Sequence, residues 1–175
     1  PQQRAHLLKR ARLFSDIDLP KVVLVNAPAG YGTTTFLTQL HRRLTESGVH
    51  VAWLSLDEDV GRDPALFACY VVLAIKQAGL DWQLLPDRQD MRCDGIDGRD
   101  LLKALLNRLD ALTRKLVIFL DDLHHLRSPE HMGLVDFMVQ NLPHQVQLVI
   151  SSRAVAKVQM SKLRAQNNVK ELTPV

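Results

Sequence analysis

The feature that most constrains the fold is a short apolar strand that runs into a glycine-containing loop and then into a helix. Lys21–Asn26 (KVVLVN) is apolar and β-branched, and Ala27–Gly32 (APAGYG) follows it directly. Over Thr33–Ser47 apolar residues recur at helical spacing, and Gly48 stands in the position that ends a helix. The sequence therefore predicts a buried strand, a tight turn and an amphipathic helix in that order.

The rest of the chain repeats this alternation. Further strands are predicted at residues 49–56, 116–120, 145–150 and 169–172, and further helices at residues 64–78, 98–113 and 129–142. Residues 81–97 are rich in Asp and Arg and are predicted to form an exposed connection. Because the central strands are apolar on both faces, we expect an α/β three-layer sandwich, with a parallel sheet of about five strands and helices on both faces.

Composition fits a single domain over residues 1–175, and 46% apolar and 23% charged residues are ordinary for a soluble globule. No apolar run approaches the roughly 18 residues that span a bilayer, so no membrane partner is expected. The first residue is Pro1 rather than Met, which suggests a piece of a longer protein. Cys69 and Cys93 give neither metal spacing nor a disulfide framework, so a cytoplasmic setting is expected.

Three unusual sequences fall at the ends of predicted strands. They are the loop after Asn26, the acidic pair Asp121-Asp122, and the run Ser151-Ser152-Arg153. In a parallel sheet covered by helices, ligands gather at the carboxyl ends of the strands. The sequence therefore predicts one ligand site that is built from these three segments.

The loop matches the phosphate-binding pattern G-x-x-x-x-G-K-S/T in context and spacing, with Ala27 for the first glycine and Thr33 for the lysine. Such a loop binds phosphate through backbone N–H groups at a helix N-terminus, and these donors survive both changes. The predicted nucleotide-binding residues are Ala27, Pro28, Ala29, Gly30, Tyr31, Gly32, Thr33, Thr34 and Thr35. The alternative is a turn of small residues that holds no phosphate.

Thr33 removes the one cation that the motif aims at the terminal phosphates. Lys21 is predicted at the opposite end of the strand, and Arg42 lies more than two helical turns beyond the loop. Loss of one preorganised electrostatic contact typically costs roughly 10²–10³ in rate. We therefore expect hydrolysis to be weak or absent, while binding suffers less because the amides and the Mg²⁺ hydroxyl of Thr34 remain.

The acidic pair supplies the second half of the site. Leu116–Leu120 is an apolar strand, after which Asp121 is predicted to hold Mg²⁺ and Asp122 to orient or deprotonate water. Arg153 is predicted to reach the γ-phosphate and, with Asp122, to act in catalysis. The alternatives are an ordinary acidic turn and a surface arginine.

With these residues assembled, the chain resembles the N-terminal nucleotide-binding domain of the MalT-like, LuxR-type ATP-dependent transcriptional regulators, of the STAND class of signalling P-loop ATPases. The segments that carry the resemblance are residues 26–32 (NAPAGYG), 51–58 (VAWLSLDE), 63–67 (DPALF), 119–124 (FLDDLH) and 148–153 (LVISSR). Members of this family usually read Pro-Ala-Gly-Tyr/Phe-Gly-Lys-Thr-Thr in the loop. Within that block, this sequence departs from the family only at Thr33.

The resemblance implies a nucleotide-dependent regulatory switch with adenine nucleotide (ATP or ADP) and Mg²⁺ as ligands, and places Arg4 near the adenine. It also implies a winged-helix domain, a sensor repeat and a DNA-binding helix-turn-helix C-terminal to these residues, and self-association on activation. DNA would then be bound only through a domain outside this chain.

Two other functions remain open. The first is an active AAA+-like ATPase or P-loop kinase, which Asp122 and Arg153 favour and Thr33 disfavours. The second is an interaction module with a vestigial pocket. The sequence also does not separate a natural threonine at position 33 from an engineered replacement of lysine.

Overall fold

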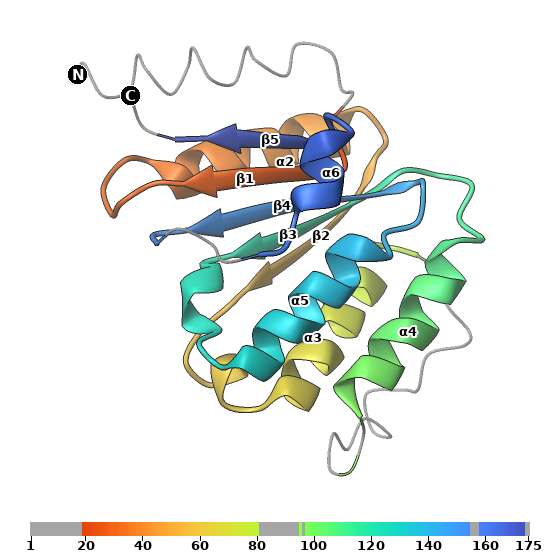
Figure 1. The fold of residues 1–175 in the computed structure, drawn as a ribbon. Helices are drawn as coiled ribbons and strands as arrows, with labels where there is room; N and C mark the ends of the chain where they lie inside the picture. The colour runs from red at the N-terminus through yellow and green to blue at the C-terminus, as the bar shows by residue number, and fades with distance from the viewer. Residues whose placement is uncertain (1–18, 81–94, 96, 155–157, 174–175) are drawn as a thin grey trace.

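The computed structural model describes residues 19–80, 95, 97–154 and 158–173, and they are built around one five-stranded parallel sheet (Figure 1). The strands are β1 (Val22–Asn26), β2 (His50–Ser55), β3 (Leu116–Asp121), β4 (Val146–Ser152) and β5 (Val169–Leu172). Their order across the sheet is β2-β3-β4-β1-β5, and every neighbouring pair is parallel. The predicted α/β class and the predicted sheet of about five parallel strands are confirmed.

The helices that connect these strands are α2 (Thr33–Glu46), α3 (Pro64–Gln77), α4 (Gly98–Leu109), α5 (Pro129–Gln140) and α6 (Ser161–Ala165). Two 3₁₀ turns, η2 (Val60–Arg62) and η3 (Leu123–His125), complete the described elements. Helix α4 ends four residues before its predicted end, because the chain tightens into turns after its last fully buried leucine, Leu109. Helix α6 was not predicted because none of its residues is buried, so it leaves no apolar periodicity.

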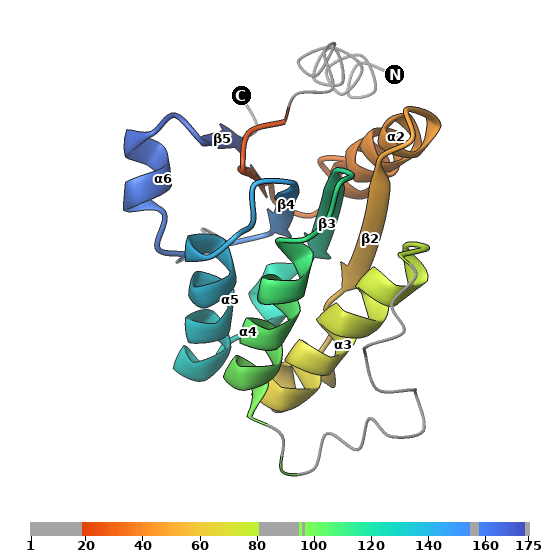
Figure 2. The same ribbon diagram turned by 90° about the vertical axis from the view of Figure 1, so that its right-hand side faces the viewer.

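The sheet is covered on both faces but unequally, as Figure 2 shows. Helices α3, α4 and α5 pack on one face and α2 packs on the other. Successive residues of β3 alternate between the two cores: Ile118 and Leu120 pack in the larger cluster with α3–α5, while Val117 and Phe119 pack in the smaller cluster with α2. This period of two is that of a strand buried on both sides.

The connections bring the predicted site segments to one edge. The chain leaves β1 towards α2 on one face of the sheet, whereas the neighbouring strand β4 is followed by Val158, Met160 and α6 on the other face. Connections that depart to opposite faces open a crevice at the carboxyl ends of the strands. The loop after β1, the end of β3 and the end of β4 meet at that crevice.

Cys69 lies in the buried face of α3 and is disulfide-bonded. The expectation from the sequence that the cysteines form no disulfide framework is therefore wrong at this residue. The connection predicted at residues 81–97 falls outside the described residues except for Gly95 and Asp97.

Within the described part of the chain, none of the helices has the length and apolar character needed to cross a bilayer.

Candidate functional site

A cavity of about 330 Å³ opens at the carboxyl edge of the sheet. Its size falls within the roughly 300–1,000 Å³ that is typical of small-molecule sites. The residues that line it are Ala27, Pro28, Ala29, Gly30, Gly32, Thr33, Thr34, Thr35, Asp121, Asp122, Ser151, Ser152 and Arg153. The structure therefore brings together all the predicted site residues except Tyr31, which does not line the cavity, and Arg4, which lies outside the described residues.

Two glycines shape the loop after β1. Gly30 has a φ of 86° and Gly32 a φ of 75°, both in the left-handed region that residues with a Cβ rarely adopt. Between them, Tyr31 donates a backbone hydrogen bond to the carbonyl of Pro28 at 3.4 Å, and the residue is 53% exposed. The loop therefore presents backbone to the cavity and turns its one large side chain away.

Helix α2 begins at this loop without a side-chain cap. Gly32 occupies the N-cap position, no side chain caps the helix, and its first turn holds no acidic residue. The first helical hydrogen bond runs from the Phe36 N–H to the Gly32 carbonyl at 3.0 Å, so the amides of Thr33–Thr35 precede the helical ladder. Free amides and the positive end of the helix dipole at a cavity wall suit an anion such as phosphate.

Asp121 faces the loop from the end of β3 and is only 8% exposed. Ser151 Oγ donates a hydrogen bond to Asp121 Oδ1 and accepts one at 2.8 Å from the backbone N–H of Asp122. Burial raises the pKa of Asp121, the neighbouring charge of Asp122 raises it further, and the Ser151 hydrogen bond opposes both. Ser151 thus holds Asp121 in place, a role that the sequence does not reveal although it places Ser151 at the end of a strand.

Asp122 adopts a left-handed backbone conformation, with φ 62° and ψ 45°. Its Oδ1 lies 3.4 Å from Arg153 Nε and 3.6 Å from His124 Nδ1. Burial lowers the pKa of His124 from an ordinary value of 6.5, so at neutral pH the partner that carries charge is Arg153. The two residues that were predicted to be catalytic are therefore paired with each other.

Lys21 and Arg42 lie away from the cavity, as the sequence predicts. Lys21 lies at the other end of the strands, where its Nζ donates to the carbonyls of Pro143 and, at 3.5 Å, Val146. Arg42 pairs with Glu46 at 3.4 Å on the outer surface of α2. Among the described residues that line the cavity, Arg153 is the single basic side chain.

The residues that line the cavity suit a magnesium ion that is bound partly by the protein and partly by phosphate oxygens. Thr34 and Asp121, the two predicted ligands, both line it. Within the residues that the structure describes, no group of three or more His, Cys, Asp or Glu side chains could hold a metal. Mg²⁺ is commonly held by one or two carboxylates with substrate phosphates and water, so this donor set is adequate for it.

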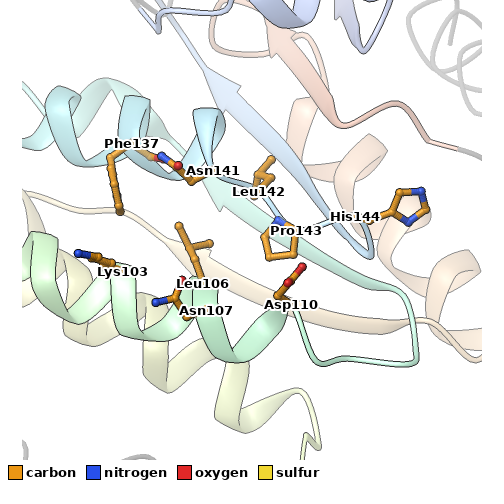
Figure 3. A pocket seen from close by; sticks show the side chains of 9 residues that line it. All are labelled: Lys103, Leu106, Asn107, Asp110, Phe137, Asn141, Leu142, Pro143 and His144. Atoms are coloured by element: carbon orange, nitrogen blue, oxygen red, sulfur yellow. The ribbon is translucent and has the colours of Figure 1, made fainter.

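A second hollow, of about 470 Å³, lies between α4 and the end of α5 (Figure 3). It is lined by Lys103, Leu106, Asn107, Asp110, Phe137, Asn141, Leu142, Pro143 and His144. Leu142, Pro143 and His144 lead into the start of β4, so this hollow lies away from the carboxyl ends of the strands, and no glycine loop lines it. The edge that collects ligands in parallel sheets is the other one.

The parallel sheet, the glycine loop that leads into α2 and the cavity at the carboxyl edge together have the architecture of a P-loop α/β domain. The chain is similar to the HTH-type transcriptional regulator MalT of Cronobacter sakazakii, with 28% identity over 175 residues that cover 98% of this chain. The predicted resemblance to the nucleotide-binding domain of MalT-like regulators is thereby confirmed. The chain spans 19% of the length of that relative, and no family model matches it.

Solved structures support the fold. The Aeropyrum pernix ORC1 protein, solved in complex with DNA, has a TM-score of 0.64 and 20% identity over 99% of this chain and 45% of its own. The Aeropyrum pernix ORC2 protein, solved as ADPNP-ADP complexes, has a TM-score of 0.60 and 15% identity over 98% of this chain and 48% of its own. At these identities the likeness establishes a shared fold.

Proposed function

We propose that this domain is the nucleotide-sensing switch of a transcriptional regulator, which binds ATP or ADP with Mg²⁺ and hydrolyses ATP weakly or not at all. The observation that carries this proposal is the uncapped start of α2, which faces buried Asp121 across one cavity. The ADPNP-ADP complexes of ORC2, a protein of the same fold, support adenine nucleotide as the ligand class.

In this proposal the amides of Gly30 and of the first turn of α2 bind the β- and γ-phosphates. Thr34 and Asp121 hold Mg²⁺, which when bound supplies charge neutralisation at the phosphates. Asp122 orients the attacking water, and Arg153 contacts the terminal phosphate. Arg4, near the adenine by family resemblance, lies outside the described residues.

The proposed weak hydrolysis follows from charge. Thr33 lines the cavity but supplies no positive charge where phosphoryl transfer requires it. Loss of one such contact costs roughly 10²–10³ in rate. Asp122 is also engaged by Arg153, so while that ion pair is formed it is not free to orient water.

The remaining partners belong to the larger protein. The relative MalT is named an HTH-type regulator, and this chain spans 19% of its length. We therefore propose that the domain acts on its own C-terminal domains, that the active form self-associates, and that DNA is bound through a helix-turn-helix outside these residues.

Calorimetry and turnover on the unaltered chain beside Thr33→Lys test the proposal, with Thr33→Ser as the matched control. We expect millimolar Mg·ADP or Mg·ATP to raise the Tm of all three, because a ligand that binds the native state stabilises it. We expect Thr33→Lys alone to raise the ATPase rate, by about 10² or more. If restoring the lysine changes neither binding nor turnover, the phosphate site is wrongly assigned.

An active ATPase or kinase is the second candidate, because Asp121, Asp122 and Arg153 all line the cavity. A rate for the unaltered chain close to that of Thr33→Lys would favour it. A chain whose Tm does not respond to either nucleotide would instead be an interaction module with a vestigial pocket.

A further inference from the structure

The Asp122–Arg153 ion pair forms part of the wall of the proposed phosphate site. Both residues line the cavity, and Arg153 Nε lies 3.4 Å from Asp122 Oδ1. Because Arg153 is the only basic side chain among the described lining residues, a phosphate in this cavity and the carboxylate of Asp122 would compete for the same guanidinium.

The backbone holds this pair at its two ends. Asp122 follows the last residue of β3, and its N–H donates to Ser151 Oγ at 2.8 Å. Arg153 follows the last residue of the neighbouring strand β4. The two side chains can therefore separate by changing rotamers while the strands stay in register.

The pair is weak enough to be displaced. The side chains of Arg153 and Asp122 are 55% and 34% exposed, and exposed ion pairs contribute little to stability. A phosphate, by contrast, carries more charge and can accept two parallel hydrogen bonds from a guanidinium. His124 Nδ1 lies 3.6 Å from the same Asp122 oxygen, so Arg153 is not the only polar neighbour of this carboxylate.

We propose that Asp122 is an intramolecular competitor of nucleotide: it binds Arg153 in the nucleotide-free domain, and the terminal phosphate of a nucleoside di- or triphosphate displaces it. This inference rests on the proposed function. Its consequence is that one binding event changes two partners, since Arg153 moves to the phosphate and Asp122 becomes free. The site thereby reports whether a phosphate is present without needing to hydrolyse it.

A double-mutant cycle tests the competition. Dissociation constants for Mg·ADP and Mg·AMP-PNP would be measured by calorimetry for the unaltered chain, Asp122→Asn, Arg153→Gln and the double variant. Asparagine keeps the size of aspartate and tolerates the left-handed backbone, so Asp122→Asn removes charge with little strain. Asp59→Asn is the matched control, because it removes one exposed, arginine-paired carboxylate outside the cavity.

We expect Asp122→Asn to bind both nucleotides about twofold to tenfold more tightly, the range that release of an exposed ion pair and of one nearby negative charge provides. Arg153→Gln should bind more weakly, and Asp122→Asn should give a clearly smaller gain in the Arg153→Gln background, where only the loss of one negative charge remains. Asp59→Asn should leave both constants unchanged.

Three outcomes would overturn the inference. If the unaltered chain binds and Asp122→Asn binds no more tightly, there is no competition, and the proposed function stands. If the gain is as large without Arg153 as with it, Asp122 acts by general repulsion and not through the pair. If neither the unaltered chain nor Asp122→Asn binds nucleotide, the inference and the proposed function fail together.

Discussion

Helices begin differently in two regions of the molecule. One region is the layer of α3, α4 and α5, and the other is the carboxyl edge of the sheet, where α2 begins. Each helix of the layer is capped by a side chain that accepts from a backbone N–H: Asp63 from Ala65 at 2.8 Å, Asp97 from Arg99 at 2.7 Å, and Ser128 from His131 at 3.2 Å. Helix α2 starts at Gly32 with no side-chain cap. In the layer, side chains of the protein accept hydrogen bonds from the first N–H groups of each helix. At the edge, the first N–H groups of α2 have no such side-chain acceptor and could bind a ligand.

Other features that cost stability gather at the same edge. Asp121 is buried there, Asp122 has a left-handed backbone, and the ring Nδ1 of His124 is buried with no hydrogen-bond partner. The core beneath α3–α5 is mostly apolar, and its buried polar exception is His131 on α5, whose Nε2 also has no hydrogen-bond partner. A buried carboxylate and a strained backbone side by side are the features that tend to persist at functional sites, which supports the proposed binding role of the edge.

The largest expected effect on stability lies in the layer. Leu105 is fully buried between α4 and its neighbours, so Leu105→Ala should lower the free energy of unfolding by about 2–5 kcal/mol. Tyr31→Ala, at the exposed tip of the loop, should change it by less than about 0.5 kcal/mol. Urea unfolding measures both, and similar losses for the two variants would abolish the contrast between the regions.

The cap of α3 gives the next effect. Asp63→Ala should cost about 1 kcal/mol, because the Ala65 N–H loses its acceptor, whereas Asp63→Asn should cost much less because asparagine caps almost equally well. Mg·ADP affinity should be unchanged in both, since α3 starts outside the cavity. A change in affinity as large as the change in stability would mean that the two regions are coupled.

Asp121→Asn should act in the opposite direction and stabilise the nucleotide-free domain at neutral pH. Burial raises the pKa of Asp121 in the folded protein above its ordinary 3.8, so folding favours the protonated carboxyl. This contribution to the free energy of unfolding is lost as pH rises through the pKa of the folded state, and at neutral pH the buried charge has a net cost. We expect a gain of up to about 1 kcal/mol, which raises the Tm of a domain of this size by roughly 2–4 °C.

Two controls accompany the Asp121→Asn measurement. The gain should shrink as pH falls towards 4, where the carboxyl is increasingly protonated in both states. The variant should also lose the extra Tm that Mg²⁺ adds to nucleotide. If Asp121→Asn is less stable than the unaltered chain at pH 7, the Asp121 carboxylate stabilises the folded domain and this prediction is wrong.

The smallest effect concerns His124. Burial lowers the pKa of His124 below 6.5, so folding favours the neutral imidazole. The stability that this provides is present above pH 6.5 and is lost as pH falls through the pKa of the folded state. His124→Gln should therefore flatten the decline in stability below pH 6.5. Thermal unfolding between pH 7.5 and 5 measures this, and parallel curves for the two proteins would exclude the effect.

Much of the fold could be predicted because its signals are local. The apolar run Leu116–Leu120 indicates a strand that is buried on both faces, and Asp63-Pro64 indicates a capped helix start; both were found where they were expected. The glycine loop and the acidic pair were placed at one edge by the general behaviour of parallel sheets.

The pairings inside the site could not be predicted because they depend on which strands are neighbours. Ser151 meets Asp121, and Arg153 meets Asp122, only because β4 lies beside β3 in the sheet. No spacing in the sequence encodes that adjacency. The left-handed backbone at Asp122 could not be predicted either, because an aspartate that follows a strand does not by itself indicate a positive φ.

A titration of the ¹⁵N-labelled domain with Mg·ADP tests most directly whether the open amides at the start of α2 bind nucleotide phosphate. We expect the amide signals of Gly30, Gly32 and Thr33–Thr35 to shift together and to saturate. The signals of the capped amides of Ala65, Arg99 and His131 should not move. Shifts centred instead on the hollow of Figure 3, around Lys103 and Asn107, or no shifts at the start of α2 at millimolar nucleotide, would contradict it.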